Sequence, residues 1–233
     1  MKLTVANSKE FERLLDGLGD DVVDAAIHFR LHKDLRESVR NFERELNQSP
    51  AFWSLTFGAH IDATRSRLFR VYDQHPDTLC LRNLLDTIRE NLDLFGAGSG
   101  SSALDVIDRG ARPPDLAILA QDLALVIPSD PLVKTLVALR GNLYAHRNAK
   151  NVAQELKIEE QFPLTYAEFE TLINRAVDIA NRYSALFRRS HWSTQMIGHD
   201  DYRQVLRAIR ERVDREEAKI REEIAKATRR AGQ

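Results

Sequence analysis

The chain has 233 residues, of which 43% are hydrophobic and 30% charged, which is typical of a folded globular protein and not of a disordered or membrane-embedded one. Its 34 Lys and Arg residues are balanced by 35 Asp and Glu residues, so any anionic partner must be bound by a local cluster and not by bulk charge. A single cysteine, Cys80, excludes an intrachain disulfide and a thiolate zinc site, and the lack of a signal peptide or membrane-length apolar run predicts a cytoplasmic protein without a membrane partner.

Apolar residues at helical spacing dominate the N-terminal part of the chain. We expect a short helix over residues 8–15, capped by Ser8, because serine side chains accept hydrogen bonds from the first free backbone amides of a helix. Gly17 and Gly19 predict a break after it. A long amphipathic helix over residues 20–47 should follow.

Ser49 and Pro50 indicate another helix start, because proline fits the first turn of a helix without losing a needed hydrogen bond. The apolar pattern predicts a long helix over residues 50–73, with Trp53 in the core, and a further helix over residues 79–94. The segment 95–102 reads FGAGSGSS, so we expect a mobile loop there.

A helical piece over residues 104–109 and an apolar segment over residues 116–127 lead to the most informative stretch, residues 132–150. This stretch reads LVKTLVALRGNLYAHRNAK. Asp130 can cap its N-terminus and Pro131 can occupy its first turn, so a helix should begin there.

Two rows of side chains follow along this helix. One row is a leucine stripe that ends three residues before His146; its members are Leu132, Leu136, Leu139 and Leu143. The second row flanks the stripe and consists of Val133, Val137, Arg140 and Tyr144. Arg140 therefore emerges beside apolar neighbours, and the sequence predicts that an arginine and a histidine meet at a buried edge.

Thr165 and Glu168 form a capping box for a long helix that reaches Phe187, which we expect to pack on the helix beginning at Leu132. A last helix should start near Asp201, and its part from residue 215 onward is almost entirely charged, which predicts a solvated helix or a frayed tail. No segment has a convincing strand pattern. The sequence thus predicts a single all-α domain over residues 1–233, a bundle of long antiparallel helices with a charged C-terminal helix.

The segment RGNLYAHRN, with Arg140 and His146 separated by five residues in an all-helical chain, resembles the signature of the HEPN superfamily. The helix SPAFWSLTFGAHIDATRSRLFRVYD and the later segment IGHDDYRQVLRAIRERV are similar to those of its abortive-infection branch. The resemblance implies a helical bundle that dimerises through its motif helices and, in active members, cleaves RNA without a metal or other cofactor.

On this resemblance, Arg140 and His146 are the catalytic residues of an endoribonuclease of a phage-defence or toxin–antitoxin type. The 2′-hydroxyl of RNA can attack the adjacent phosphate, and an imidazole that titrates near neutrality can move the protons. A permanently charged guanidinium can neutralise the developing charge. The residues expected to bind the RNA are Asn142, Tyr144, Arg147, Asn148 and Lys150. An antitoxin or another regulatory protein is a further partner that the resemblance leaves open.

Residues six apart on a straight helix point about 120° away from each other. Arg140 and His146 can therefore meet only if the helix unwinds near Gly141 or if a twofold dimer joins two copies of the pair, and we favour the dimer. Gly141 and Asn148 depart from the branch, which often has polar and acidic residues at these positions.

Plainer interpretations stay open. Arg140 can pair with an acidic neighbour while His146 caps the helix C-terminus. The rival function is a non-catalytic helical module that binds RNA, a nucleotide or a protein through the same groove. His28 and His32 lie one turn apart but have no third ligand for a metal.

Overall fold

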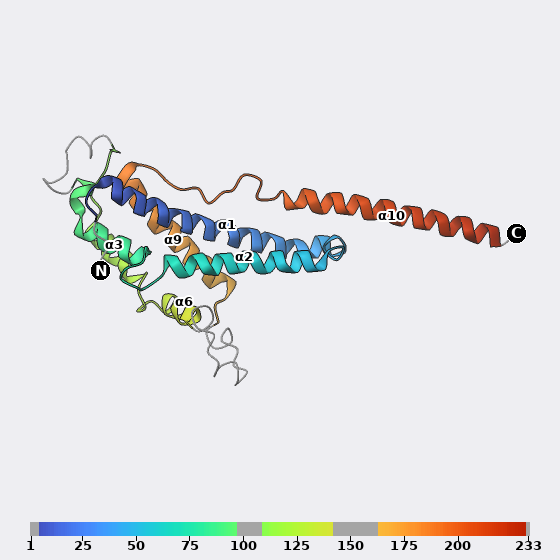
Figure 1. Cartoon of the computed structure of the whole chain (residues 1–233), viewed down its shortest axis with the longest axis horizontal. Coiled ribbons are helices and arrows are strands. Elements are labelled where there is room, and N and C mark those ends of the chain that lie inside the picture. Colours follow the sequence, from blue (N-terminus) through green and yellow to red (C-terminus); the bar gives the residue numbers. More distant parts are fainter. Residues whose placement is uncertain (1–4, 97–108, 142–162, 232–233) are drawn as a thin grey trace, which may run out of the picture. The chain divides into compact units, whose positions relative to one another are not determined.

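A computed structural model describes residues 5–96, 109–141 and 163–231, and every regular element in these ranges is a helix (Figure 1). The all-α prediction is therefore confirmed. The chain divides into two compact units, the first formed by residues 1–27 and 63–194 and the second by residues 28–62 and 195–233. Helices α1 (Ser8–Leu46) and α2 (Pro50–Val71) contribute residues to both units.

The remaining elements of the first unit are short helices and one long helix. They are α3 (Leu81–Glu90), the 3-10 helix η1 (Leu92–Phe95), α5 (Leu116–Ala124), α6 (Pro131–Arg140) and α9 (Tyr166–Arg188). Helix α3 packs on α5, while α6 and η1 pack on α9, which confirms the expected pairing of α9 with α6. The core of this unit includes three rings in edge-to-face contact, with centroids 4.8 to 5.5 Å apart: Phe11, Phe95 and Phe187.

The predicted break at Gly17 and Gly19 is wrong, because α1 continues through both residues. A Cβ atom at Gly19 would lie 2.5 Å from the indole of Trp192, and one at Gly17 would lie 3.3 Å from Leu79. These glycines therefore allow close packing against other segments and do not make a turn. The backbone of α1 leaves the helical region at Phe42 instead (φ −134°, ψ 26°).

The predicted helix over residues 79–94 is divided at Asn91 into α3 and η1. The Asn91 side chain donates to the carbonyl of Thr87 (2.8 Å), a local bond that competes with the continuing helix. Phe95, which was expected to begin a mobile loop, is fully buried. Residues 97–108, with the rest of that loop and nearly all of the helical piece predicted at 104–109, lie outside the described residues.

Several helix starts in the first unit carry side-chain caps. At α1 the amide of Glu10 donates to Oδ1 of Asn7 (3.0 Å), so Asn7 caps this helix and the predicted cap at Ser8 is wrong. Asp130 accepts hydrogen bonds from the amides of Leu132 (3.0 Å) and Val133 (3.1 Å), which confirms the predicted start of α6. Thr165 and Glu168 form the predicted capping box of α9, and Asp115 caps α5.

The second unit contains the later part of α1, the earlier part of α2 and α10 (Tyr202–Ala231). Its core includes Leu35, Leu46, Trp53 and Leu206, so the expected burial of Trp53 is confirmed. The charged end of α10 is an exposed helix that continues to Ala231.

The two histidines of α1 that lie one turn apart have separate partners in the second unit. Nδ1 of His28 lies 2.9 Å from Nδ1 of His60, whereas Nδ1 of His32 lies 3.0 Å from the carbonyl of Phe57. Within the described ranges, no three acidic, histidine or cysteine side chains come together as metal ligands do. The described helices also include none with the length and apolarity needed to cross a membrane.

Candidate functional site

Helix α6 carries Arg140 at its last position. The buried side chains of this helix are Val133, Leu136 and Leu139. Arg140 follows Val133 by seven residues and Leu136 by four, so it shares their face, the one that packs into the unit. Its side chain is nevertheless 39% exposed. The guanidinium therefore reaches from the packed face of α6 to the solvent.

Asp73 holds this guanidinium from the segment that directly follows α2. Nη1 of Arg140 lies 2.5 Å from Oδ1 of Asp73, whose side chain is only 9% exposed. The same carboxylate accepts hydrogen bonds from the amides of Gln74 (2.7 Å) and His75 (3.2 Å). Burial by itself raises the pKa of Asp73, but the bonds from Arg140 and the two amides outweigh it, and the net pKa lies below the ordinary value.

Hydrogen bonds tie the segment around Asp73 to the rest of the first unit. The buried hydroxyl of Tyr72 donates to the carbonyl of Leu172 in α9 (2.7 Å). The side-chain amide of Gln74 donates to the carbonyl of Val126, which lies between α5 and α6 (3.0 Å). The carboxylate that orients Arg140 is thus fixed from both sides along the chain.

A second ion pair anchors the other end of α6. Nη1 of Arg175 in α9 lies 3.1 Å from Oδ2 of Asp130, the capping residue, and donates to the carbonyl of Leu125 (2.8 Å). Asp130 therefore caps α6 and binds α9 at the same time. Both ends of this short helix have a carboxylate–arginine contact, so its backbone is well positioned to present Arg140.

Of the predicted site residues, only Arg140 lies in a described part of the chain. His146 and the expected RNA-binding residues lie outside the described residues; these are Asn142, Tyr144, Arg147, Asn148 and Lys150. Gly141 keeps right-handed helical angles (φ −59°, ψ −39°), so the helix does not unwind at Gly141 itself.

Asp73 is the functional candidate that sequence reasoning missed. It is the last residue of the stretch that resembles the abortive-infection branch, so its position in that stretch was a usable signal. The arginines earlier in α2 belong to another cluster, since Arg67 (2.6 Å) and Arg70 (2.6 Å) both pair with Asp21 of α1. These two arginines are therefore engaged in fastening α2 to α1 within the first unit.

Comparison with models of protein families gives a match. A family model described as AbiU2, of the HEPN type, matches residues 8–227, which is nearly the whole chain. Neither a search of curated proteins nor a search of solved structures gives a match.

Proposed function

The chain belongs to the AbiU2 family of HEPN proteins of the abortive-infection branch, and from this premise we propose that it is a metal-independent endoribonuclease of a phage-defence or toxin–antitoxin type. The observation that supports the proposal most is that Arg140 is both paired and partly exposed. This arginine is oriented by a buried carboxylate and still exposes 39% of its side chain. A guanidinium held in this way is suited to bind a phosphate with little loss of side-chain entropy.

The proposed reaction is an internal transfer within the RNA. His146 takes the proton of a 2′-hydroxyl, and the 2′-oxygen bonds to the adjacent phosphorus as the bond from that phosphorus to the 5′-oxygen breaks. The imidazolium then gives its proton to the leaving 5′-oxygen. The products are a 2′,3′-cyclic phosphate and a 5′-hydroxyl end, and no water, metal or oxidant is consumed. Arg140 neutralises the extra negative charge on the phosphate as the new bond forms.

Asp73 is a positioning residue in this scheme. A guanidinium has five N–H donors in a planar fork, and Asp73 contacts Arg140 through Nη1. The fork can therefore bind the carboxylate on one side and a phosphate on another. Because the carboxylate also accepts two backbone amides, it has a fixed direction and aims the guanidinium.

The active unit in this proposal is a homodimer. Arg140 and His146 are six positions apart, which places them about 120° apart on one straight helix. Gly141, which caps the C-terminus of α6, keeps right-handed helical angles. A twofold axis beside the motif helix would bring Arg140 of one protomer towards His146 of its partner, and the cleft would contain two copies of the pair.

Cleavage of RNA by the full chain in the presence of a chelator tests the proposal. We expect products with cyclic phosphate ends, and His146→Ala should lower the rate by a factor of about 10² to 10⁴, the usual share of general acid–base catalysis. Light scattering should show a dimer for both proteins. Undiminished cleavage by the His146→Ala dimer would refute the assignment.

One observation favours the rival function, a non-catalytic binding module. Arg140 already has a carboxylate partner, as a purely structural arginine does. This alternative predicts saturable binding of RNA without any product, and Arg140→Ala would then lower the binding affinity or the free energy of unfolding and leave no turnover to lose. Product analysis of the wild-type chain separates the two functions directly.

A further inference from the structure

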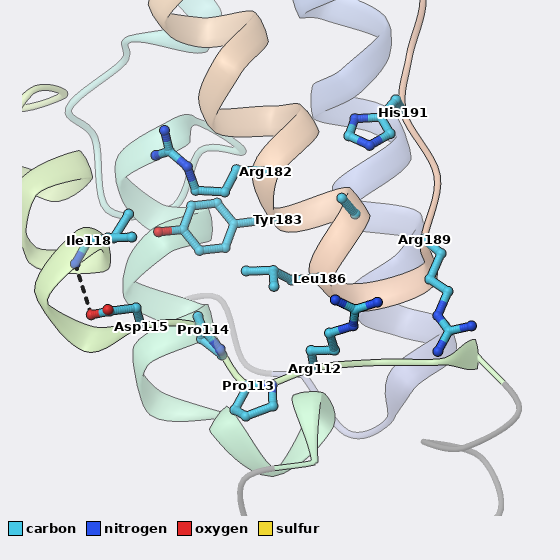
Figure 2. Close-up of a pocket in the computed structure, with 11 residues that line it drawn as sticks. Arg112, Pro113, Pro114, Asp115, Ile118, Arg182, Tyr183, Leu186, Arg189 and His191 are labelled. Atoms are coloured by element: carbon cyan, nitrogen blue, oxygen red, sulfur yellow. Dashed lines mark hydrogen bonds between the residues drawn. The ribbon is translucent and has the colours of Figure 1, made fainter.

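A pocket of about 650 Å³ lies in the first unit, beside the last turns of α9 and the segment that leads into α5 (Figure 2). None of the predicted catalytic or RNA-binding residues is among those that line it. The side chains that define its character are Arg112, Pro113, Pro114, Tyr183, Leu186 and Arg189. Small-molecule sites usually have volumes of about 300 to 1,000 Å³, so this pocket is of the size that binds an organic ligand.

In the described part of the chain, one end of the pocket has no unpaired cation. The guanidinium of Arg182 pairs with the buried carboxylate of Asp122, which also accepts a hydrogen bond from the hydroxyl of Tyr183 (2.9 Å). Burial is the main cause of a raised pKa at Tyr183, and the bond to Asp122 adds to it, so the hydroxyl stays protonated. This end therefore presents a ring and an internally balanced ion pair. The carboxylate of Asp115 also lines it and accepts hydrogen bonds from the amides of Ala117 (2.7 Å) and Ile118 (3.3 Å).

The other end has two arginines that contact no carboxylate among the described residues. Arg112 is anchored by its backbone, whose amide donates to the carbonyl of Leu186 (2.7 Å), and its side chain is left for the pocket. Arg189 donates from Nε to the carbonyl of Gly110 (3.2 Å). Other arginines of this unit have acidic partners, such as Arg188 with Glu12 at 3.1 Å. The positive charge of the pocket is thus concentrated at this end.

The backbone holds Arg189 in an unusual conformation. Arg189 has a positive φ of 55°, and no other non-glycine residue in the described ranges does. Its side chain lies across Gly110, where φ is 63° and a Cβ atom would come within 2.2 Å of Nε of Arg189. Glycine is the usual residue at such a helix end, because a side chain in the left-handed region costs about 1 kcal/mol or more. Arg189 occupies this position instead, and its side chain lines the pocket.

The wall between the two ends is apolar. It consists of the rings of Pro113 and Pro114, the side chains of Ile118 and Leu186, and the ring of Tyr183, as Figure 2 shows. A bare phosphate ion would fill only a small part of the pocket and would leave this wall in contact with water. The ligand that fits has an anionic group for Arg112 and Arg189 and a flat organic body for the wall.

The pocket is distinct from the Arg140 site. The segment that holds Asp73 is tied to α9 at Leu172, through the hydroxyl of Tyr72. Arg182 lies ten residues further along α9, which corresponds to about 15 Å at the rise of an α-helix. A ligand in the pocket would therefore not occupy the site of Arg140.

We propose that this pocket binds one nucleotide unit, with its phosphate on Arg112 and Arg189 and its base against the Pro113–Pro114 wall. Arginine is the preferred phosphate ligand because its planar fork matches the phosphate oxygens, and a base is the flat body that stacks on rings and packs on leucine. The unit comes either from a free mononucleotide or from the phosphorylated 5′ end of an RNA. The proposal does not depend on catalysis by His146.

Calorimetric titration of the full chain with AMP, orthophosphate and a short 5′-phosphorylated RNA tests the proposal. Arg112→Gln removes an exposed guanidinium that is proposed to bind the phosphate. Ala185→Leu fills the pocket from α9 without changing the charge. Arg13→Gln is the matched control, because it removes the same charge from an exposed position that does not line the pocket. Circular dichroism checks that each variant is folded.

We expect one AMP per chain, at least about tenfold weaker binding in both pocket variants, and unchanged binding in the control and in His146→Ala. If only the RNA binds and both pocket variants weaken it, the strand end is the source of the nucleotide. Orthophosphate that binds as tightly as AMP would exclude an organic ligand. Equal losses in Arg13→Gln, or AMP and RNA affinities untouched by both pocket variants, would overturn the site.

Discussion

The two arginine sites of the first unit differ in how their charge is balanced. At the end of α6, Arg140 is paired with a buried carboxylate. Beyond the end of α9, Arg112 and Arg189 are anchored through backbone groups and keep their charge. A paired guanidinium has a fixed direction but a weakened field, which suits a group that must meet one reacting phosphate. An unpaired guanidinium attracts anions more strongly, which suits capture of a ligand.

The largest expected effect on this difference between the two sites comes from removal of the Asp73 carboxylate. Asp73→Ala leaves Arg140 without its partner and also leaves the amides of Gln74 and His75 without their acceptor. We expect the free energy of unfolding to fall by about 2 to 3 kcal/mol, since a broken charged hydrogen bond costs about that much when one partner remains half-exposed. Urea unfolding followed by circular dichroism measures the change.

Arg112→Gln is the matched comparison for Asp73→Ala, because it removes a charge that has no acidic partner among the described residues. Its free energy of unfolding should stay within about 0.5 kcal/mol of the wild-type value. RNA cleavage should also distinguish the two sites. In Asp73→Asn we expect a lower kcat at an unchanged KM, because a misdirected Arg140 fails to stabilise the transition state. Equal stability losses in the two variants would remove the distinction between the sites.

A smaller expected effect is the pH dependence of stability that comes from the ionisation of Asp73. Burial disfavours its charged form, yet the bond from Arg140 keeps the pKa below the ordinary value of 3.8. A carboxyl group with a lowered folded-state pKa stabilises the fold fully above its unfolded-state pKa, and this stabilisation is lost as the pH falls through the folded-state pKa. The difference in free energy of unfolding between wild type and Asp73→Asn should therefore be constant from about pH 7 to pH 5 and shrink below about pH 4.

Acid titration of Arg112→Gln provides the reference for this measurement. Because Arg112 pairs with no carboxylate among the described residues, the difference in free energy of unfolding between Arg112→Gln and wild type should stay constant over the same pH range. A wild-type advantage over Asp73→Asn that persists unchanged to pH 2 would show that the ion pair does not stabilise the fold.

The sequence predicted several features that depend on neighbouring residues, although it missed the local helix end at Asn91, and it missed the features that depend on distant residues. The caps at Asp130 and Thr165 were predictable because both partners lie within three residues. The roles of Gly17 and Gly19 were not, since Gly19 is approached by Trp192, more than 170 positions later, and Gly17 by Leu79, about 60 positions later. Composition marks a glycine, but only the fold tells whether it turns the chain or admits a neighbour.

The candidate site follows the same division. Arg140 was found from its place beside an apolar stripe, which is a local property of one helix. Asp73, its partner from 67 positions earlier, and the pocket at the end of α9 required the tertiary arrangement. Arg189 gave no local signal, because an arginine in the left-handed region does not differ in sequence from an arginine in the helix before it.

The smallest expected effect is the difference in stability between two variants at position 189, which shows whether Arg189 serves the ligand or the fold. Replacing Arg189 removes one exposed hydrogen bond to Gly110, but glycine also relieves the left-handed backbone conformation whereas alanine does not. We therefore expect Arg189→Gly to be more stable than Arg189→Ala by about 1 kcal/mol and to be close to wild type, while AMP binding falls equally in both. Urea unfolding and calorimetric titration on the same preparations supply both numbers. If Arg189→Gly is as destabilised as Arg189→Ala, the side chain contributes chiefly to the fold; if its stability is retained and its nucleotide affinity is lost, the strained backbone conformation is maintained for the ligand.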